Sequence, residues 1–100
     1  MTALTFYFDA GCPWTWLTSR WLVEATGRAG VPITWRTFSL GLINAGTEIP
    51  DEWIPLLEAS TLAHRVVESL AEEGRHEDAG AFYTAYGRRR FELDEPLEGL

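Results

Sequence analysis

The chain has 100 residues, of which 46% are hydrophobic and 23% are charged, and its formal net charge is −7. These values are typical of one small globular domain. The acidic excess argues against nucleic acid and anionic membrane surfaces as partners. One cysteine excludes an intrachain disulfide and a cysteine-rich zinc site. Because the sequence has no signal-peptide pattern and no apolar run long enough for a membrane span, we expect a cytoplasmic protein.

The first part of the chain predicts a strand followed by a helix. Residues 4–9 alternate between two sets of side chains and are rich in aromatic residues, as in a strand. Cys12 and Pro13 then open a helical pattern, and proline suits the first helical position because its missing N–H would have no partner there. The helix should end between Gly27 and Gly30. Trp14, Leu17, Trp21 and Ala25 recur at helical spacing and are expected on one face of this helix.

The later segments predict one more strand and then helices. A second strand is expected over residues 33–39, so residues 1–40 should form a βαβ unit with parallel strands. Residues 41–51 contain several chain breakers and are expected to form a loop. Residues 52–92 are expected to form a helical insertion, and residues 93–100 a tail without a clear pattern.

Two helices are expected in the helical insertion. The first should run from about Glu52 to Gly74 and the second from about Glu77 to Phe91. The three arginines at 88–90 suit the C-terminal end of the second helix, where positive charge is favourable. We interpret them as a solvated helix end, with an anion site as the alternative.

Cys12 occupies a position that favours a reactive thiol. A cysteine at a helix N-terminus should place its sulfur near the N–H groups of Trp14 and Thr15 and the positive end of the helix dipole, which both favour the thiolate. The Thr15 hydroxyl could also donate to the sulfur. A lone cysteine is more often a small buried hydrophobe. The glycine before it, Pro13 after it, and the strand and helix on either side favour the reactive role.

The sequence around this cysteine resembles a known family. Residues 8–21, which contain Cys12-Pro13-Trp14-Thr15, resemble the active-site segment of DsbA-like thioredoxin-fold proteins. Within these, they look most like the actinobacterial mycothiol-dependent reductases, including the nitroreductase branch. Residues 35–40 and 81–87 are similar to the same group, so the resemblance extends from about residue 4 to 94. It implies an α/β fold, the N-terminal part of a thioredoxin-like, DsbA-type domain in which a helical insertion follows the βαβ unit.

The resemblance implies a thiol-dependent oxidoreductase that uses a single cysteine. Relatives commonly carry Cys-Pro-Trp-Cys, whereas this chain has Thr15 in the resolving position, so a dithiol cycle within one chain cannot occur. Cys12 would attack a mixed disulfide or an electrophile, and an external thiol, mycothiol or glutathione, would resolve the adduct. We therefore expect Cys12 and Thr15 as catalytic residues and Pro13 and Trp14 as substrate-binding residues. No bound cofactor and no metal are expected.

The length of the relatives bears on this expectation. They have longer chains whose remaining strands return after the helical insertion, so residues 1–100 should be an incomplete domain or need a partner. Two other functions stay open: a kappa-like thiol transferase or isomerase that activates a bound thiol, and a non-catalytic remnant that binds a partner chain through its unfinished sheet. The expected partners are a small thiol, a small-molecule or disulfide substrate and, as an assembly, a homodimer.

The other aromatic and charged residues have simpler interpretations. Trp14 is either an aromatic wall for the substrate or a packing residue, whereas packing is expected for Trp16, Trp21, Trp35 and Phe38. His64 and His76 lack metal-ligand spacing, and His64 is expected on the surface or on a lid. Asp9 could tune the thiol, take part in proton transfer or cap the end of the strand.

Overall fold

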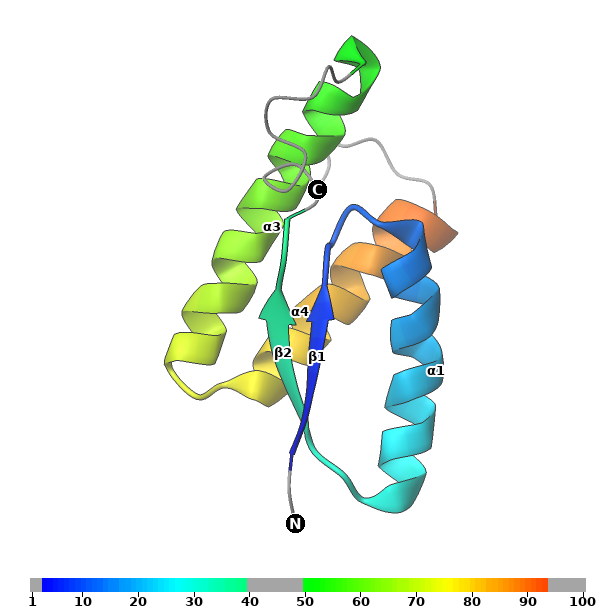
Figure 1. The fold of residues 1–100 in the computed structure, drawn as a ribbon, viewed down its shortest axis with the longest axis vertical. Helices are drawn as coiled ribbons and strands as arrows, with labels where there is room; N and C mark the ends of the chain where they lie inside the picture. Colours follow the sequence, from blue (N-terminus) through cyan, green and yellow to red (C-terminus); the bar gives the residue numbers. More distant parts are fainter. Residues whose placement is uncertain (1–2, 40–49, 94–100) are drawn as a thin grey trace.

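The structure, a computed structural model, describes residues 3–39 and 50–93. Most of the expected loop at 41–51 and of the tail at 93–100 lies outside these residues. The elements in chain order are β1 (Leu4–Phe8), α1 (Pro13–Ala29), β2 (Ile33–Thr37), the 3-10 turn η1 (Asp51–Trp53), α3 (Ile54–Glu72), α4 (His76–Gly87) and the π-helical turn η2 (Arg88–Glu92) (Figure 1). This order confirms the predicted α/β class, with a βαβ unit followed by helices. The division into domains stays a prediction.

The two strands form a parallel pair. Leu4 lies opposite Ile33 and Phe8 opposite Thr37 in the ladder. At its ends the Leu4 N–H donates to the Pro32 carbonyl at 2.9 Å, and the Phe38 N–H donates to the Phe8 carbonyl at 3.0 Å. Both strands therefore end one or two residues earlier than the alternation predicted.

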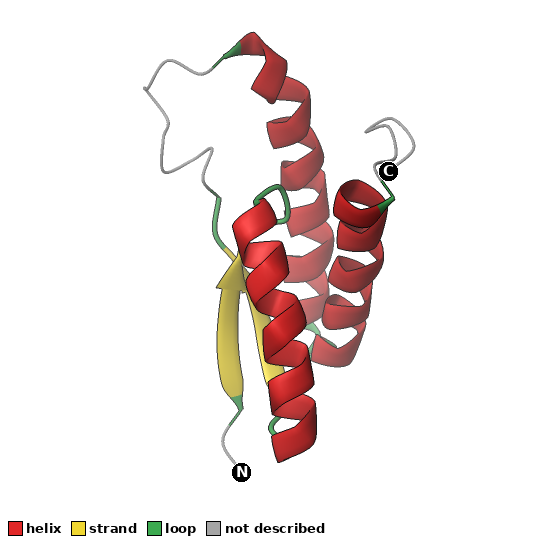
Figure 2. Ribbon diagram, turned by 90° about the vertical axis from the view of Figure 1, so that its right-hand side faces the viewer, coloured by secondary structure: helices red, strands yellow, loops and turns green. Residues whose placement is uncertain are grey.

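The helices pack around the strands so that aromatic rings meet in one core. Helix α4 crosses behind the strands, and α1 and α3 flank them (Figure 1). In Figure 2 the strands lie toward one side and α4 toward the other. The buried Tyr83 ring of α4 stacks on Phe8 with ring centroids 3.9 Å apart, and Trp35 packs edge-on against both rings. The predicted burial of Trp35 is confirmed, and Phe38 is half-buried.

The predicted core position of Trp21 is wrong, because the face of α1 that carries it is exposed. Within the described part of the chain, Trp14, Leu17 and Trp21 are 75%, 59% and 68% exposed. The helix instead packs through Trp16, whose indole lies edge-on against Tyr83 at 5.6 Å. Ser19 and Thr26 lie on the same buried side of α1. Their burial is tolerated because each hydroxyl donates to a carbonyl of its own helix.

The helix ends agree with the expected boundaries. Helix α1 ends at Gly30, which has the left-handed φ of 70° and donates its N–H to the Gly27 carbonyl. Gly74, with φ 74°, follows α3 in the same way. The predicted last helix is divided, because after Gly87 the chain widens into the π-helical turn η2. None of the described helices is long and apolar enough to cross a membrane.

Candidate active site

Cys12 lies at the turn that joins β1 to α1. It is the N-cap residue of this 17-residue helix, with φ −94° and ψ 116°, and Pro13 is the first helical residue. The Cys12 N–H donates to the Asp9 carbonyl at 3.0 Å, and the Cys12 carbonyl accepts the first helical hydrogen bond from Trp16 at 3.2 Å. The side chain is only partly buried. The thiol therefore lies at the positive end of the helix dipole and within reach of solvent.

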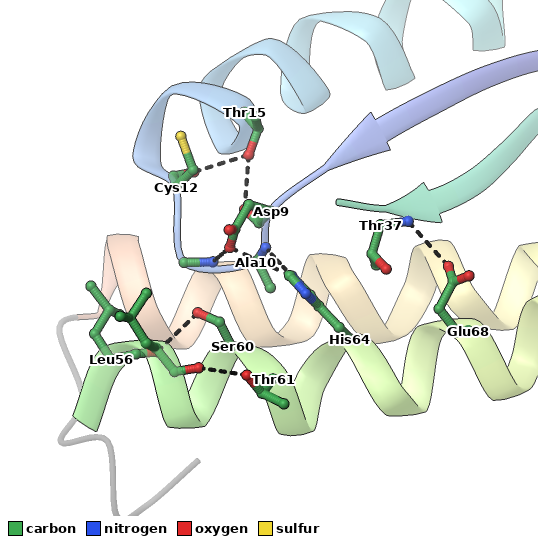
Figure 3. A network of polar contacts seen from close by, with 12 residues as sticks. Asp9, Ala10, Cys12, Thr15, Thr37, Leu56, Ser60, Thr61, His64 and Glu68 are labelled. Atoms are coloured by element: carbon green, nitrogen blue, oxygen red, sulfur yellow. Dashed lines mark hydrogen bonds and ion pairs between the residues drawn. The ribbon is translucent and has the colours of Figure 1, made fainter. Parts of the chain in front are cut away.

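The sulfur itself is oriented differently from the expectation. Among the described residues, no helical N–H makes a capping hydrogen bond to the Cys12 side chain. Figure 3 shows the sulfur directed away from α3. Direct N–H donation from Trp14 and Thr15 is therefore absent, and the helix can act on the thiolate only through its dipole.

Thr15 does not donate to the sulfur either, which corrects the second expectation. Its hydroxyl lies 2.9 Å from the Asp9 carbonyl and 3.1 Å from the Cys12 carbonyl (Figure 3). The physical reason is that a carbonyl oxygen is a much better acceptor than a thiol sulfur. Thr15 thus fastens the first turn of α1 to the end of β1, and Asp9 O accepts from both Thr15 and Cys12.

Asp9 also organises the turn through its side chain. The carboxylate is only 4% exposed, and its Oδ1 accepts the Gly11 N–H at 2.8 Å. This is the pattern by which aspartate residues stabilise tight turns. A side chain at Gly11 would also disturb the site, because its Cβ would overlap the Ser60 hydroxyl on α3 and force that hydroxyl to move. The capping role considered for Asp9 is therefore present, at the start of the turn that carries the cysteine.

His64 is the site residue that the sequence analysis misplaced. It is 9% exposed rather than on the surface or a lid. Its Nε2 accepts the Ala10 N–H at 2.8 Å and lies 3.5 Å from Asp9 Oδ1 (Figure 3). The available signal was helical periodicity: Ser60, His64 and Val67 recur at spacings of four and three residues, which places them on one face of α3.

Tyr83 lies beneath the same turn. Burial raises the pKa of Tyr83; the nearby hydroxyls of Thr15 and Ser19 oppose this, and a charged Cys12 would add to it. The tyrosine hydroxyl nevertheless has no hydrogen-bond partner in the described part of the chain. The Thr15 and Ser19 hydroxyls donate to backbone carbonyls and therefore do not donate to the Tyr83 oxygen.

The predicted substrate-binding residues are not among those that line the cavity beside Asp9. A cavity of about 230 Å³ lies between Asp9, Ser39 and the first turns of α3, and it includes Ser60 and Thr61. Pro13 and Trp14 are exposed on the leading turn of α1. They follow Cys12 directly in the sequence, and their role in binding stays a prediction.

The remaining charged residues form no metal site. Residues 3–39 and 50–93 contain no group of three or more histidine, cysteine or acidic side chains placed to hold a metal ion. At the expected solvated helix end, Arg88 pairs with Glu92 at 3.4 Å. Arg20, which the sequence analysis left aside, lies 4.1 Å from the centre of the Trp16 ring and donates to the Thr84 hydroxyl at 2.9 Å.

A parallel βαβ unit with Cys-Pro at the start of its helix, followed by packed helices, defines the N-terminal piece of a thioredoxin-like protein. Residues 11–97 match the family described as Rv2466c-like, mycothiol-dependent nitroreductase Rv2466c, and the chain belongs to this family. The predicted resemblance to actinobacterial mycothiol-dependent reductases is thereby confirmed, whereas the closer DsbA-like relationship stays a prediction.

A curated relative shows how much of such a protein the chain spans. The chain is 43% identical over 54 residues to the uncharacterized protein Rv2286c of Mycobacterium tuberculosis. The aligned segment is 52% of this chain but only 24% of that protein. The chain therefore matches about a quarter of the length of this relative.

Proposed function

We propose that the protein is a thiol-dependent oxidoreductase, or part of one, in which Cys12 is the nucleophile and mycothiol is the co-substrate. The observation that carries the proposal is the place of Cys12, a partly exposed thiol at the N-cap of a 17-residue helix. Membership in a family named for a mycothiol-dependent nitroreductase supports the choice of thiol. The one free thiol needs no bound cofactor and suits a reducing compartment such as the cytoplasm.

The reaction we propose is thiol–disulfide exchange through a mixed disulfide. The Cys12 thiolate attacks one sulfur of a disulfide between mycothiol and a substrate thiol, the S–S bond breaks, and the substrate leaves as a thiolate that takes up a proton. Cys12 is then joined to mycothiol. A second mycothiol thiolate attacks the mycothiol sulfur of this adduct and releases Cys12. The net result is that the substrate leaves as a free thiol, one free mycothiol is consumed, and it forms mycothiol disulfide with the mycothiol that was joined to the substrate.

The residues after the cysteine have distinct roles in this proposal. Pro13 begins the helix whose dipole favours the thiolate. Thr15 acts as a positioning residue, because its hydroxyl ties the helix start to the Asp9 carbonyl. Trp14, exposed two residues from the thiol, is assigned to contact with mycothiol or substrate. An exposed indole can contribute a large apolar contact surface.

Mass spectrometry tests the proposal directly. After incubation with mycothiol disulfide, the chain should gain one mycothiol on Cys12, and free mycothiol should remove it. Cys12→Ser is the control and should gain nothing. Cys12 should also react with iodoacetamide near about pH 6 much faster than free cysteine does. An ordinary alkaline reactivity profile without any adduct would contradict the proposal.

A kappa-like thiol transferase or isomerase is the second candidate. The exposed Trp14 beside the thiol supports it equally, since such a surface could hold a bound thiol that never becomes covalently attached. Tight binding of mycothiol without a mass increase on Cys12 would favour this function over the oxidoreductase.

A non-catalytic chain that binds a partner is the third candidate. Its support is the uncovered side of α1 in the described part of the chain, where Trp14, Leu17 and Trp21 are exposed. The outer edge of β1 adds to it: Leu4 and Phe8 bond to the β2 side, so by alternation Thr5 and Tyr7 direct their backbone groups outward. A stable homodimer or hetero-oligomer with an inert Cys12 thiol, measured by sedimentation and alkylation, would favour this candidate.

A further inference from the structure

The turn that carries Cys12 is fastened to α3 through His64. The Ala10 N–H can only donate, so the His64 Nε2 atom at 2.8 Å must offer its lone pair. The imidazole is therefore neutral in this arrangement and carries its proton on Nδ1. The contact joins residues 54 positions apart and is buried.

A proton on Nε2 is incompatible with this contact. Protonated Nε2 would become a donor facing a second donor, and the buried Ala10 N–H would lose its acceptor. The nearest acceptor that we identify for the new proton on Nε2 is Asp9 Oδ1, which lies 3.5 Å away. Because Asp9 Oδ1 also accepts the Gly11 N–H at 2.8 Å, movement of the imidazolium toward Asp9 competes with a second hydrogen bond of the turn.

We propose that His64 is a positioning residue for Cys12 that acts only as the neutral imidazole, and that protonation of Nε2 releases the turn at Ala10. The inference deepens the proposed oxidoreductase function and depends on Cys12 being its nucleophile. Ala10 is two residues before Cys12, and the Cys12 N–H bonds back to the Asp9 carbonyl. Release of Ala10 therefore disturbs the N-cap geometry that holds the thiol at the helix start, and attack by Cys12 slows.

A carboxylate and a small cavity lie beside His64. Asp9 is the carboxylate beside the ring, with Oδ1 3.5 Å from Nε2, and the Ala10 N–H donates to the same nitrogen. A cavity of about 290 Å³ is lined by His64 and by polar neighbours that include Thr61. Among the described residues, further charged or titratable groups in this region are Arg65 and Glu68, which line the same cavity, and Arg36 of β2, which pairs with Glu68. On α4 they are Tyr86, which interacts with Asp9, and Tyr83, which stacks on Phe8.

Nuclear magnetic resonance tests the contact without reference to catalysis. The chain has two histidines, so His76→Gln assigns the His64 ring signals by elimination. We expect the Ala10 amide shift to titrate with the same midpoint as the His64 ring. In His64→Gln, whose side-chain oxygen can accept the same N–H but cannot titrate in this range, the Ala10 step should disappear. An Ala10 amide that is unaffected while His64 titrates would overturn the proposal.

Alkylation of Cys12 tests the consequence for reactivity. Near about pH 7.5, where imidazole is mostly neutral, His64→Gln should react within about twofold of the wild type. His64→Leu removes the acceptor and should react about fivefold more slowly, the effect of one lost hydrogen bond. On acidification the wild-type rate should fall more steeply than the His64→Gln rate, and His76→Gln should follow the wild type.

The two proposals fail in different ways. Equal alkylation rates in folded wild type, His64→Gln and His64→Leu at all pH values would overturn the positioning role of His64. If the wild type showed neither fast alkylation nor a mycothiol adduct, the oxidoreductase proposal would be refuted. The pH dependence of the Ala10 amide signal would still decide whether His64 accepts the Ala10 N–H. Circular dichroism establishes that each variant is folded.

Discussion

Trp16 of α1 lies so close to Gly87 of α4 that a Cβ on Gly87 would overlap its six-membered ring. This contact sets how closely α1 approaches α4, and it brings the Trp16 ring against Tyr83 and Phe91. A glycine within a helix normally lowers stability relative to alanine. Here it is needed, because only its lack of a side chain admits the indole.

Gly87→Ala should therefore destabilise the chain by about 1–3 kcal/mol, the usual cost of overpacking a core, as measured by urea unfolding. Gly27→Ala is the matched control. Gly27 lies on α1, and no described atom would come within 4 Å of its Cβ. This substitution should be neutral or stabilise by up to about 1 kcal/mol, because alanine favours the helix. Equal effects of the two substitutions would contradict the close approach.

Glu68 should make the stability of the chain depend on acid pH. Burial alone would raise the pKa of Glu68, but hydrogen bonds from Arg36 and the Thr37 N–H and the charge of Arg36 hold it below its ordinary value. A carboxyl with a lowered folded pKa stabilises the protein above its unfolded pKa of about 4.3, and this contribution is lost as the pH falls through the folded value.

Glu68→Gln should thus be less stable than the wild type near neutral pH. In urea unfolding the difference should shrink as the pH falls below about 4.3 and disappear once the pH is below the folded pKa of Glu68. Glu24→Gln is the control, because the Glu24–Arg28 pair is exposed and such pairs contribute little. If Glu68→Gln destabilised the chain equally at neutral and strongly acid pH, the ion pair could not be the cause.

The buried Tyr83 hydroxyl should lower the free energy of unfolding relative to a phenylalanine at this position. It is buried, and no described residue accepts or donates a hydrogen bond to it, so Tyr83→Phe should be neutral or stabilise by up to about 1 kcal/mol. Burial raises the pKa of Tyr83, and the wild type should therefore lose stability relative to Tyr83→Phe as the pH rises above the unfolded value of about 10. Urea unfolding at neutral and alkaline pH measures both effects. Marked destabilisation by Tyr83→Phe at neutral pH would show that the hydroxyl has a partner.

The local elements could be predicted from the sequence because their signals are local. Alternation marks the strand that ends at Phe8, Pro13 marks the start of α1, and Gly30 and Gly74 mark helix ends through their left-handed φ. The position of Cys12 at the helix start follows from the same signals. These features depend on neighbours within a few residues.

The contacts that define the site could not be predicted in this way. Helix α1 has two faces with tryptophans, and burial of the Trp16 face depends on Gly87, more than 70 residues away. In the sequence Ser19 makes the Trp16 face of the helix more polar, but in the structure its hydroxyl donates to the Trp16 carbonyl and can therefore be buried. Similarly, the Ala10–His64 bond joins segments 54 residues apart, so no local pattern could have revealed it.

Thr15→Cys should change how a mycothiol adduct on Cys12 is resolved. In the wild type the Thr15 hydroxyl cannot attack the disulfide between Cys12 and mycothiol, so the adduct should persist until free mycothiol is added. A thiol one helical turn after Cys12 can attack the Cys12 sulfur, expel mycothiol and form an intramolecular disulfide. The adduct of Thr15→Cys should therefore disappear without added thiol, as followed by mass spectrometry.

Thr15→Ser is the matched control for this substitution, because it keeps the hydroxyl that bonds to the Asp9 carbonyl. Its adduct should be as long-lived as that of the wild type. The comparison controls for loss of the threonine methyl group, since both variants remove it. An adduct that persists equally in all three proteins would mean that position 15 cannot reach the Cys12 sulfur, and the monothiol cycle would then not be a consequence of Thr15.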